Sequence, residues 1–350
     1  MENNQQSNQI SGAITYPQRN EQQAPVQPRQ PRNLQGLLRF AMEATKAEDA
    51  PGNSELGPMD EERRKFLEEA LKSLTVDIAE LLHKAIKVLT DSEKIKSIQF
   101  GSELPEDVEA SFNSLMEFID DIDISNDFYK VGGFAMFPIC FSSENDQVRS
   151  RASRVLAELC QNNPFCQARA LECGLVNVLL HMVGTERGET LASCISALSC
   201  ACREFKPSCE EVIAQEGCET LANILSTAQG PARTKVAFFV TYLCQQHPPA
   251  REKFIKLNIV KILAEQIKSG RDSSSEHLLS IIHSLLESLD QTVVQQCLDP
   301  SLNLKNILEN HLKDPEVQDA YIEEKNYCEV ILKILEKCPQ VEVVNSEADR

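Results

Sequence analysis

The sequence predicts an all-α fold of stacked helical repeats, because three kinds of marker residue recur about every 42 residues across the segment 126–288. One marker is a glycine in a short apolar phrase, another is a proline, and the third lies near the end of an apolar helical run. The markers are Gly133, Gly174, Gly217 and Asn258; Pro164, Pro207 and Pro248; and Cys160, Cys202, Cys244 and Leu286. A period of roughly 40–47 residues with only helices between the breaks is typical of armadillo and HEAT repeats. We therefore expect a right-handed armadillo-like α-solenoid.

Composition and periodicity together divide the chain into successive parts. Residues 1–58 are rich in Gln, Asn and Pro, so we expect a disordered N-terminal tail, interrupted by an apolar peptide motif at 31–42. Residues 59–125 are expected to form an N-terminal helical cap, and residues 126–288 to form four armadillo-like repeats. Residues 289–350 supply a degenerate fifth repeat and a C-terminal cap, because the end units of a solenoid need a polar outer face.

The N-terminal cap is predicted to contain three helices. The first begins at Asp60, where acidic residues in the first turn interact favourably with the helix dipole. The second follows the apolar spacing from Ile78 to Leu89, and the third covers about 106–121. Residues 91–105 are expected to be a linker between them.

Each repeat is predicted to hold a short helix before the glycine, a second helix after it and a long third helix. In the second copy these helices cover 164–172, 175–183 and 190–204. The glycine permits a sharp turn in a left-handed conformation, which Asn258 also tolerates. The proline suits the first turn of the next helix. A last helix from Tyr321 to Cys338 closes the C-terminal end.

Charge and composition exclude several functions. The chain has 35 Lys and Arg against 53 Asp and Glu, a net charge of −18, which argues against binding to nucleic-acid phosphates. The sequence shows no signal peptide and no apolar run of about 18 residues, so we expect no membrane span and a cytoplasmic protein. The 13 cysteines are odd in number and mostly lie in helical runs, as expected of small apolar residues in a reducing compartment.

No catalytic or metal-binding constellation is found in the sequence. The phosphate-binding loop, the dinucleotide fingerprint and the nucleophile elbow are all absent. His277 and His283 lie too far round one helix to share a zinc ion, and the cysteines lack paired Cys-x-x-Cys spacing. We therefore predict no catalytic residue, no metal and no cofactor, and a protein that is not an enzyme.

The third helices of such a solenoid stack side by side and line its concave face, so their outward positions are candidates for a binding groove. The marker at the end of each third helix faces the core and sets the phase. The predicted groove residues are Arg151, Arg154, Glu158, Ser196, Cys200, Lys235, Phe238, Tyr242, His277, Ser280 and Ser284. Phe238 and Tyr242 beside Lys235 would make a central anchor, since aromatic and cationic side chains dominate interface energetics. The alternative is that Phe238 packs inside like Phe239.

The motif at 31–42 allows two interpretations. Its characteristic residues are Arg32, Leu34, Leu37, Leu38, Arg39 and Phe40. One interpretation is an amphipathic helical turn that docks onto the folded body through its leucines. The other is a peptide meant for a partner's groove, because so short a helix is marginal in water and linkers on both sides hold it away from any core.

The run from Pro31 to Leu38, followed by the run from Pro58 to Arg64, resembles the N-terminus of the armadillo-type nucleotide-exchange factors of the Hsp-seventy-binding protein / Fes1 family. The resemblance continues through three further segments, 149–162, 235–247 and 276–288. It extends over most of the chain, although the first thirty residues and the loose fifth repeat depart from the family pattern.

The resemblance implies a co-chaperone that binds one lobe of the ATPase domain of a seventy-kilodalton heat-shock chaperone in its concave face. Such binding is incompatible with a closed nucleotide cleft, so ADP leaves and ATP can rebind. The motif at 31–42 resembles the extended peptides that these chaperones hold, and we expect it to occupy their substrate-binding domain and aid client release.

Two further expectations complete this hypothesis. We expect a monomer that binds neither nucleic acid nor a membrane. The alternative function is a different armadillo scaffold or adaptor, which would need regular asparagines or tryptophans in its groove. The corresponding positions here are Glu158, Cys200, Tyr242 and Ser284, and the chain has no Trp.

Overall fold

The chain divides into two units, Met1–Asp77 and Ile78–Arg350, and the computed structural model describes residues 61, 65 and 77–338. The predictions for the tail and its motif lie outside the described residues, and the helix predicted from Asp60 is described only at residues 61 and 65, which are both helical. Within the described residues every regular element is a helix, which confirms the all-α prediction.

The helices of the second unit follow in order along the chain. Those of the N-terminal cap are α3 (Ile78–Leu89), α4 (Ser92–Ser97) and α5 (Glu106–Phe118). The next are α6 (Ile122–Lys130), the 3-10 helix η1 (Gly133–Ala135), α7 (Met136–Phe141), α8 (Asp146–Cys160), α9 (Pro164–Glu172), α10 (Leu175–Thr185), α11 (Gly188–Cys202), α12 (Lys206–Ala214), α13 (Gly217–Thr227), α14 (Gly230–Gln246), α15 (Pro248–Lys256), α16 (Ile259–Ser269) and α17 (Ser275–Leu286). The last are α18 (Gln291–Leu298), α19 (Leu304–His311), α20 (Pro315–Asp319) and α21 (Ile322–Lys337).

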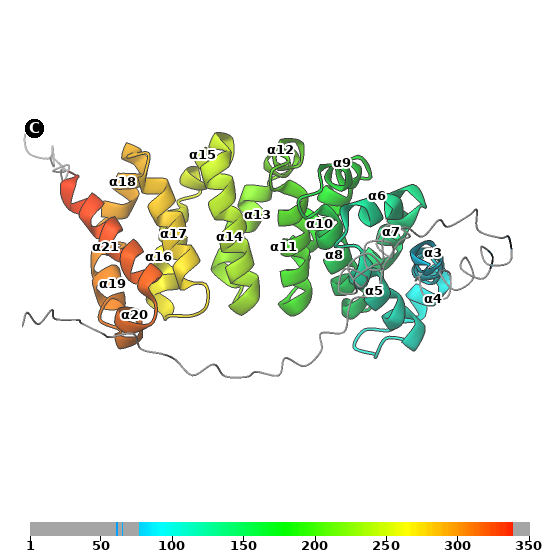
Figure 1. Cartoon of the computed structure of the whole chain (residues 1–350). Helices are drawn as coiled ribbons and strands as arrows, with labels where there is room; N and C mark the ends of the chain where they lie inside the picture. The colour runs from blue at the N-terminus through cyan, green and yellow to red at the C-terminus, as the bar shows by residue number, and fades with distance from the viewer. Residues whose placement is uncertain (1–60, 62–64, 66–76, 339–350) are drawn as a thin grey trace, which may run out of the picture. The chain divides into compact units, whose positions relative to one another are not determined.

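The long third helices of successive copies stack on one another. Helix α8 packs against α11, α11 against α14, α14 against α17, and α17 against α21. Figure 1 shows α8, α11, α14 and α17 side by side in chain order. A single hydrophobic core runs beneath them from Leu82 to Leu335. Each copy therefore buries its apolar face against its neighbours, as repeat units that lack an independent core must do.

The marker glycine permits a left-handed turn in two of the four copies. Gly174 and Asn258 have φ of 70° and 52° at the starts of α10 and α16, as the sequence predicts. In the other two copies the left-handed residue is the one before the marker, namely Gly132 with φ 86° and Glu216 with φ 58°.

The remaining two marker glycines, Gly133 and Gly217, are needed for close packing instead. A Cβ atom on Gly133 would collide with the Phe128 ring. A Cβ atom on Gly217 would lie 2.5 Å from the carbonyl oxygen of Val212. The turn prediction is thus wrong in mechanism for these two copies, although the glycines mark the right places.

The marker prolines lie in the first turns of α9, α12 and α15, as predicted. Side chains of these helices also satisfy the ends of the third helices. Gln167 donates through Nε2 to the carbonyl oxygens of Cys200 and Arg203, each at 2.8 Å. Arg251, on α15, donates to the carbonyl oxygen of Leu285 at the end of α17. Because the last carbonyls of a helix lack intrahelical partners, these bonds fix the first helix of a copy against its third.

The linker predicted for 91–105 contains a helix. The carboxylate of Asp91 accepts a hydrogen bond from the Lys94 N–H at 3.1 Å and so caps α4. Ile95 and Ile98 are buried and anchor this short segment on the core. The six residues of α4 contain only one apolar residue, Ile95, which is too few to produce a recognisable helical period, so sequence reasoning missed the helix.

All 13 cysteines are free, and most of them are buried. Burial raises the pKa of the Cys140 thiol to about 12 and that of Cys194 to about 11. Only Cys173 is exposed, while Cys200 and Cys338 are half-buried. The buried thiols therefore behave as small apolar core residues.

Candidate protein-binding surface

The candidate surface is formed by the outward-facing positions of α8, α11, α14 and α17, and we call it the third-helix face. Cys160, Cys202, Cys244 and Leu286 are all buried, so the marker at the end of each helix faces the core as predicted. Three of the predicted groove residues are exposed: Arg154, Lys235 and Phe238. Seven are half-buried: Arg151, Glu158, Ser196, Cys200, Tyr242, His277 and Ser280.

The α8 part of the face is linked to the N-terminal cap. The Arg151 guanidinium donates to Asn113 Oδ1 at 2.8 Å and to Glu109 Oε1 at 2.9 Å, both on α5. Part of the donor capacity of Arg151 is therefore used within the molecule. Arg154, about one turn further along the helix, is exposed.

The centre of the face is a cluster of aromatic rings with an arginine laid on them. Phe238 is 45% exposed, which excludes the alternative that it packs inside like Phe239. The Arg203 guanidinium carbon lies 5.0 Å from the Phe238 ring centroid and 6.0 Å from that of Tyr242. The rings of Phe238 and His277 meet edge to face with centroids 6.1 Å apart. Side chains from three consecutive copies thus meet at one place.

The hydroxyl of Tyr242 is held by the backbone. It accepts a hydrogen bond from the N–H of Glu204, a residue in the left-handed region with φ 58°, at 2.8 Å. Burial raises the pKa of the Tyr242 phenol above its usual value, and this hydrogen bond lowers it by less. The phenol is therefore protonated at neutral pH and keeps its own O–H as a donor.

Several of the predicted residues lie around Cys200. Burial raises the pKa of its thiol, and the charges of Arg203, Glu158 and Lys235 act on the same thiol. The structure therefore places Glu158 of α8, Cys200 of α11 and Lys235 of α14 in one neighbourhood. A buried thiol with a raised pKa is a poor nucleophile, so Cys200 contributes surface rather than chemistry.

The α17 end of the face differs from the prediction at Ser284. Ser280 bonds to the His277 carbonyl oxygen at 2.9 Å and to the Thr241 hydroxyl at 3.2 Å, and both serine and histidine remain half-buried. Ser284 is only 2% exposed and is not presented to a partner. Its side chain is short and α21 packs along α17, so neighbouring groups cover it.

Arg203 is the part of the cluster that the sequence prediction missed. The prediction considered only positions before the marker on each third helix, whereas Arg203 directly follows the marker Cys202 and is the C-cap residue of α11. The equivalent residues in the other copies are Gln161, Gln245 and Glu287. The sequence therefore shows a positively charged residue at this position in only one of the four copies, and that difference could have pointed to Arg203.

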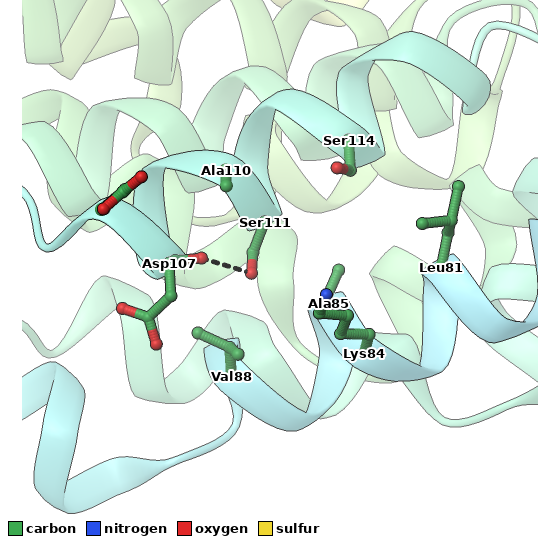
Figure 2. A pocket seen from close by; sticks show the side chains of 9 residues that line it. Leu81, Lys84, Ala85, Val88, Asp107, Ala110, Ser111 and Ser114 are labelled. Atoms are coloured by element: carbon green, nitrogen blue, oxygen red, sulfur yellow. Dashed lines mark hydrogen bonds between the residues drawn. The ribbon is translucent and has the colours of Figure 1, made fainter.

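A separate pocket of about 490 Å³ lies between α3 and α5. Figure 2 shows Leu81, Ala85 and Val88 on one side and Asp107 and Ser111 on the other. The Ser111 hydroxyl donates to the backbone carbonyl of Asp107 at 2.6 Å, so its hydrogen is used within α5. None of the predicted groove residues lines this pocket.

The described part of the chain has neither a metal-binding cluster nor a membrane-spanning helix. No group of three or more His, Cys, Asp or Glu side chains there is arranged to hold a metal ion. None of the helices at residues 61, 65 and 77–338 combines the length and apolar character that a membrane crossing requires.

The fold and this face define a class of protein: an armadillo-like helical solenoid whose third helices present an aromatic and cationic surface. The chain matches two family models, the nucleotide exchange factor Fes1 over residues 34–128 and the SIL1/FES1/HPBP1 C-terminal domain over residues 125–230. The chain therefore belongs to the Fes1 family of nucleotide exchange factors, as the resemblance of its N-terminal motifs implied.

Relatives agree with this family assignment, and solved structures agree with the fold. The chain is 26% identical over 319 residues to Hsp70-binding protein 1 of Mus musculus, covering 89% of this chain and 87% of the relative. It is 25% identical over 318 residues to Hsp70-binding protein 1 of Homo sapiens, covering 89% and 86%. The designed armadillo repeat protein YIII(Dq)4CqI matches 73% of this chain and 99% of its own at 11% identity, with a TM-score of 0.56. This last likeness supports the armadillo-like fold and nothing beyond it.

Proposed function

We propose that this protein is an Hsp70 co-chaperone that binds the chaperone's ATPase domain through the third-helix face and promotes ADP release. Membership of the Fes1 family of nucleotide exchange factors is the observation that carries the proposal. The relatives named Hsp70-binding protein 1, matched over 89% of the chain, point to the same partner. The function requires binding and not catalysis.

The mechanism follows from linkage between two binding events. A factor that binds the open form of the nucleotide cleft better than the closed form shifts the chaperone towards the open form. By reciprocity, its binding weakens ADP binding by the same factor. A rigid solenoid suits this role, because a face fixed by a continuous core can select one arrangement of the partner's lobes.

The contacts are proposed to come from the exposed and half-buried residues of the third-helix face. Phe238 and Tyr242 on α14 form the anchor together with Lys235, and Arg154 extends the face towards α8. Aromatic and arginine side chains carry most of the binding energy in typical interfaces, which supports this choice. Arg151, Glu158, Ser196, Cys200, His277 and Ser280 complete the proposed surface.

The proposal is tested by release of labelled ADP from a purified Hsp70, with and without this protein. We expect faster release, and weaker acceleration by the Lys235→Glu and Tyr242→Ala variants. No acceleration and no binding by the unaltered chain would overturn the proposed function. Unaltered activity of both variants would reject the choice of face and leave the function standing.

The N-terminal motif at 31–42 is proposed to occupy the substrate-binding domain of the chaperone and hinder client rebinding. Its leucines between Arg32 and Arg39, with Phe40 directly after Arg39, fit a groove that holds extended apolar peptides. A form lacking residues 1–45 should keep full ADP release and release client more slowly. Equal rates of client release from the two forms would contradict this part.

We further propose a cytoplasmic monomer that is not an enzyme. The division proposed for the second unit is a helical cap before residue 126, four repeats to residue 288 and a closing region after it. Sedimentation at several concentrations tests the monomer, and a rise in mass with concentration would contradict it.

A further inference from the structure

Arg203 occupies an unusual place on the third-helix face. It is the C-terminal boundary residue of α11 and is exposed, while its guanidinium lies over Phe238 and Tyr242 of the next third helix. The guanidinium carbon lies 5.0 Å and 6.0 Å from the two ring centroids. Contact with an aromatic ring leaves the N–H groups of a guanidinium available to an acceptor.

No acceptor within the described part of the chain uses those N–H groups. The Arg203 guanidinium forms no hydrogen bond or ion pair with any residue that the structure describes. Glu158 and Glu204 carry the nearby negative charges, and neither is paired with it. Arg151 and Arg233, by contrast, are paired with Glu109 and Asp272.

The neighbouring phenol adds a second donor. The Tyr242 oxygen accepts from the Glu204 N–H, so its hydroxyl hydrogen remains free to donate outward. The raised pKa of Tyr242 keeps this hydrogen in place at neutral pH. Lys235 lies in the same neighbourhood and supplies a second positive charge.

We propose that Arg203, which lies beside Phe238 and Tyr242, is the receptor for a carboxylate side chain of the partner and fixes its register on the third-helix face. The inference rests on the proposed function and names the chemistry that this site recognises. Arginine pairs with carboxylates through two parallel N–H bonds, which gives geometric selectivity as well as affinity. Lysine, a point charge on a flexible stem, cannot reproduce that pairing.

The test compares variants in a direct binding assay with the ATPase domain of a purified Hsp70 and in the ADP-release assay. Arg203→Gln should raise the Kd about 10-fold or more, because loss of one member of a desolvated charge pair is costly. Arg203→Lys should also weaken binding, though less than Arg203→Gln does. The matched control is Lys256→Gln, which removes one exposed positive charge on α15 away from this face and should leave the Kd unchanged.

A second measurement identifies the acceptor. A carbodiimide couples a lysine amine to a carboxylate, so the Arg203→Lys variant should form a crosslink at position 203 to an Asp or Glu of the chaperone. Crosslinked peptides at position 203 and a raised Kd for Arg203→Gln would together support the inference.

The outcomes separate the inference from the function on which it rests. If Arg203→Gln binds like the unaltered chain while Lys235→Glu does not, Arg203 is no receptor and the proposed function stands. If the unaltered chain neither binds nor accelerates ADP release, both proposals fall. If the Kd rises as much for Lys256→Gln as for Arg203→Gln, the effect comes from net charge alone, and the specific role of Arg203 is overturned.

Discussion

Three arginines in the described part of the chain, Arg169, Arg203 and Arg271, lie over aromatic rings, and the surroundings of the last two differ. Arg203 lies over Phe238 and Tyr242 at the centre of the third-helix face and has no carboxylate partner among the described residues. Arg271, between α16 and α17, lies 3.5 Å from the Tyr321 ring centroid. It is also close to two carboxylates of the C-terminal end.

The carboxylates around Arg271 come from different helices. Its Nη1 lies 2.9 Å from Glu316 of α20, and its Nε lies 3.4 Å from Glu324 of α21. Glu324 also bonds to His311 Nε2 at 2.8 Å, and both of these side chains are buried. A nearby aromatic ring therefore accompanies ion pairs at Arg271, and N–H groups without an acceptor among the described residues at Arg203. This contrast supports the receptor role that we propose for Arg203.

The largest loss in the free energy of unfolding is expected when the network around Arg271 is broken. Glu324→Ala removes the buried carboxylate that bonds to His311 and forms an ion pair with Arg271. Removing one member of a buried charged network costs about 3–5 kcal/mol, because the remaining groups lose their partner. Urea-induced unfolding of the full chain measures the change.

The control for this variant is Glu323→Ala on the same helix. Glu323 is exposed, so its removal should change the free energy of unfolding by less than about 0.5 kcal/mol. Equal losses for the two variants would show that the Arg271 network is not the stabilising feature of the C-terminal end.

The helices that follow Arg203 in the chain are packed closely at Gly217, where α13 begins. Gly217→Ala places a Cβ atom against Val212, 2.5 Å from its carbonyl oxygen, and backbone cannot move aside cheaply. We expect a loss of about 1–3 kcal/mol, the usual cost of overpacking. The midpoint of thermal unfolding reports it.

Gly184→Ala is the matched control in the neighbouring helix. An added Cβ there meets only the Thr220 methyl group at 3.8 Å, so the variant should be neutral or slightly more stable. A loss in Gly184→Ala as large as that in Gly217→Ala would mean that the loss does not come from the contact with Val212.

The comparison also shows what the sequence can and cannot predict. The period of the markers predicts the three-helix units, because each marker has a local physical role: the prolines begin helices and Cys202 faces the core. The same phase places Phe238 and Tyr242 correctly on the outward side. It misplaces Ser284, since burial depends on the length of the side chain and on the helix packed over it.

The pairing of the two arginines could not be predicted from the sequence, for a physical reason. Whether Arg203 is free and Arg271 is paired depends on residues far away in the chain, such as Phe238 for the first and Glu324 for the second. No local period carries that information. The helix α4 was missed for the opposite reason, because it is too short to show a period at all.

A smaller loss in the free energy of unfolding is expected when Arg203 itself is replaced. Arg203→Ala should lower the free energy of unfolding by less than about 0.5 kcal/mol, because an exposed side chain without an ion pair contributes little to stability. Arg271→Ala should lower it by several times more. Parallel urea titrations measure both, and equal losses would erase the distinction between the two arginines.

The smallest expected effect is the pH dependence of the stability that the Tyr242 phenol, beside Arg203, contributes. The pKa of Tyr242 lies above the ordinary value of 10.0, chiefly because burial disfavours the charged phenolate. A folded-state pKa above the unfolded one gives a stabilisation that is fully present below about pH 10 and is lost as the pH rises through the folded value. The difference in free energy of unfolding between the unaltered chain and Tyr242→Phe should therefore stay constant between about pH 7 and 9 and change only above about pH 10. A difference that already varied between pH 7 and 8 would mean that the phenol ionises near neutrality and cannot serve as the second donor beside Arg203.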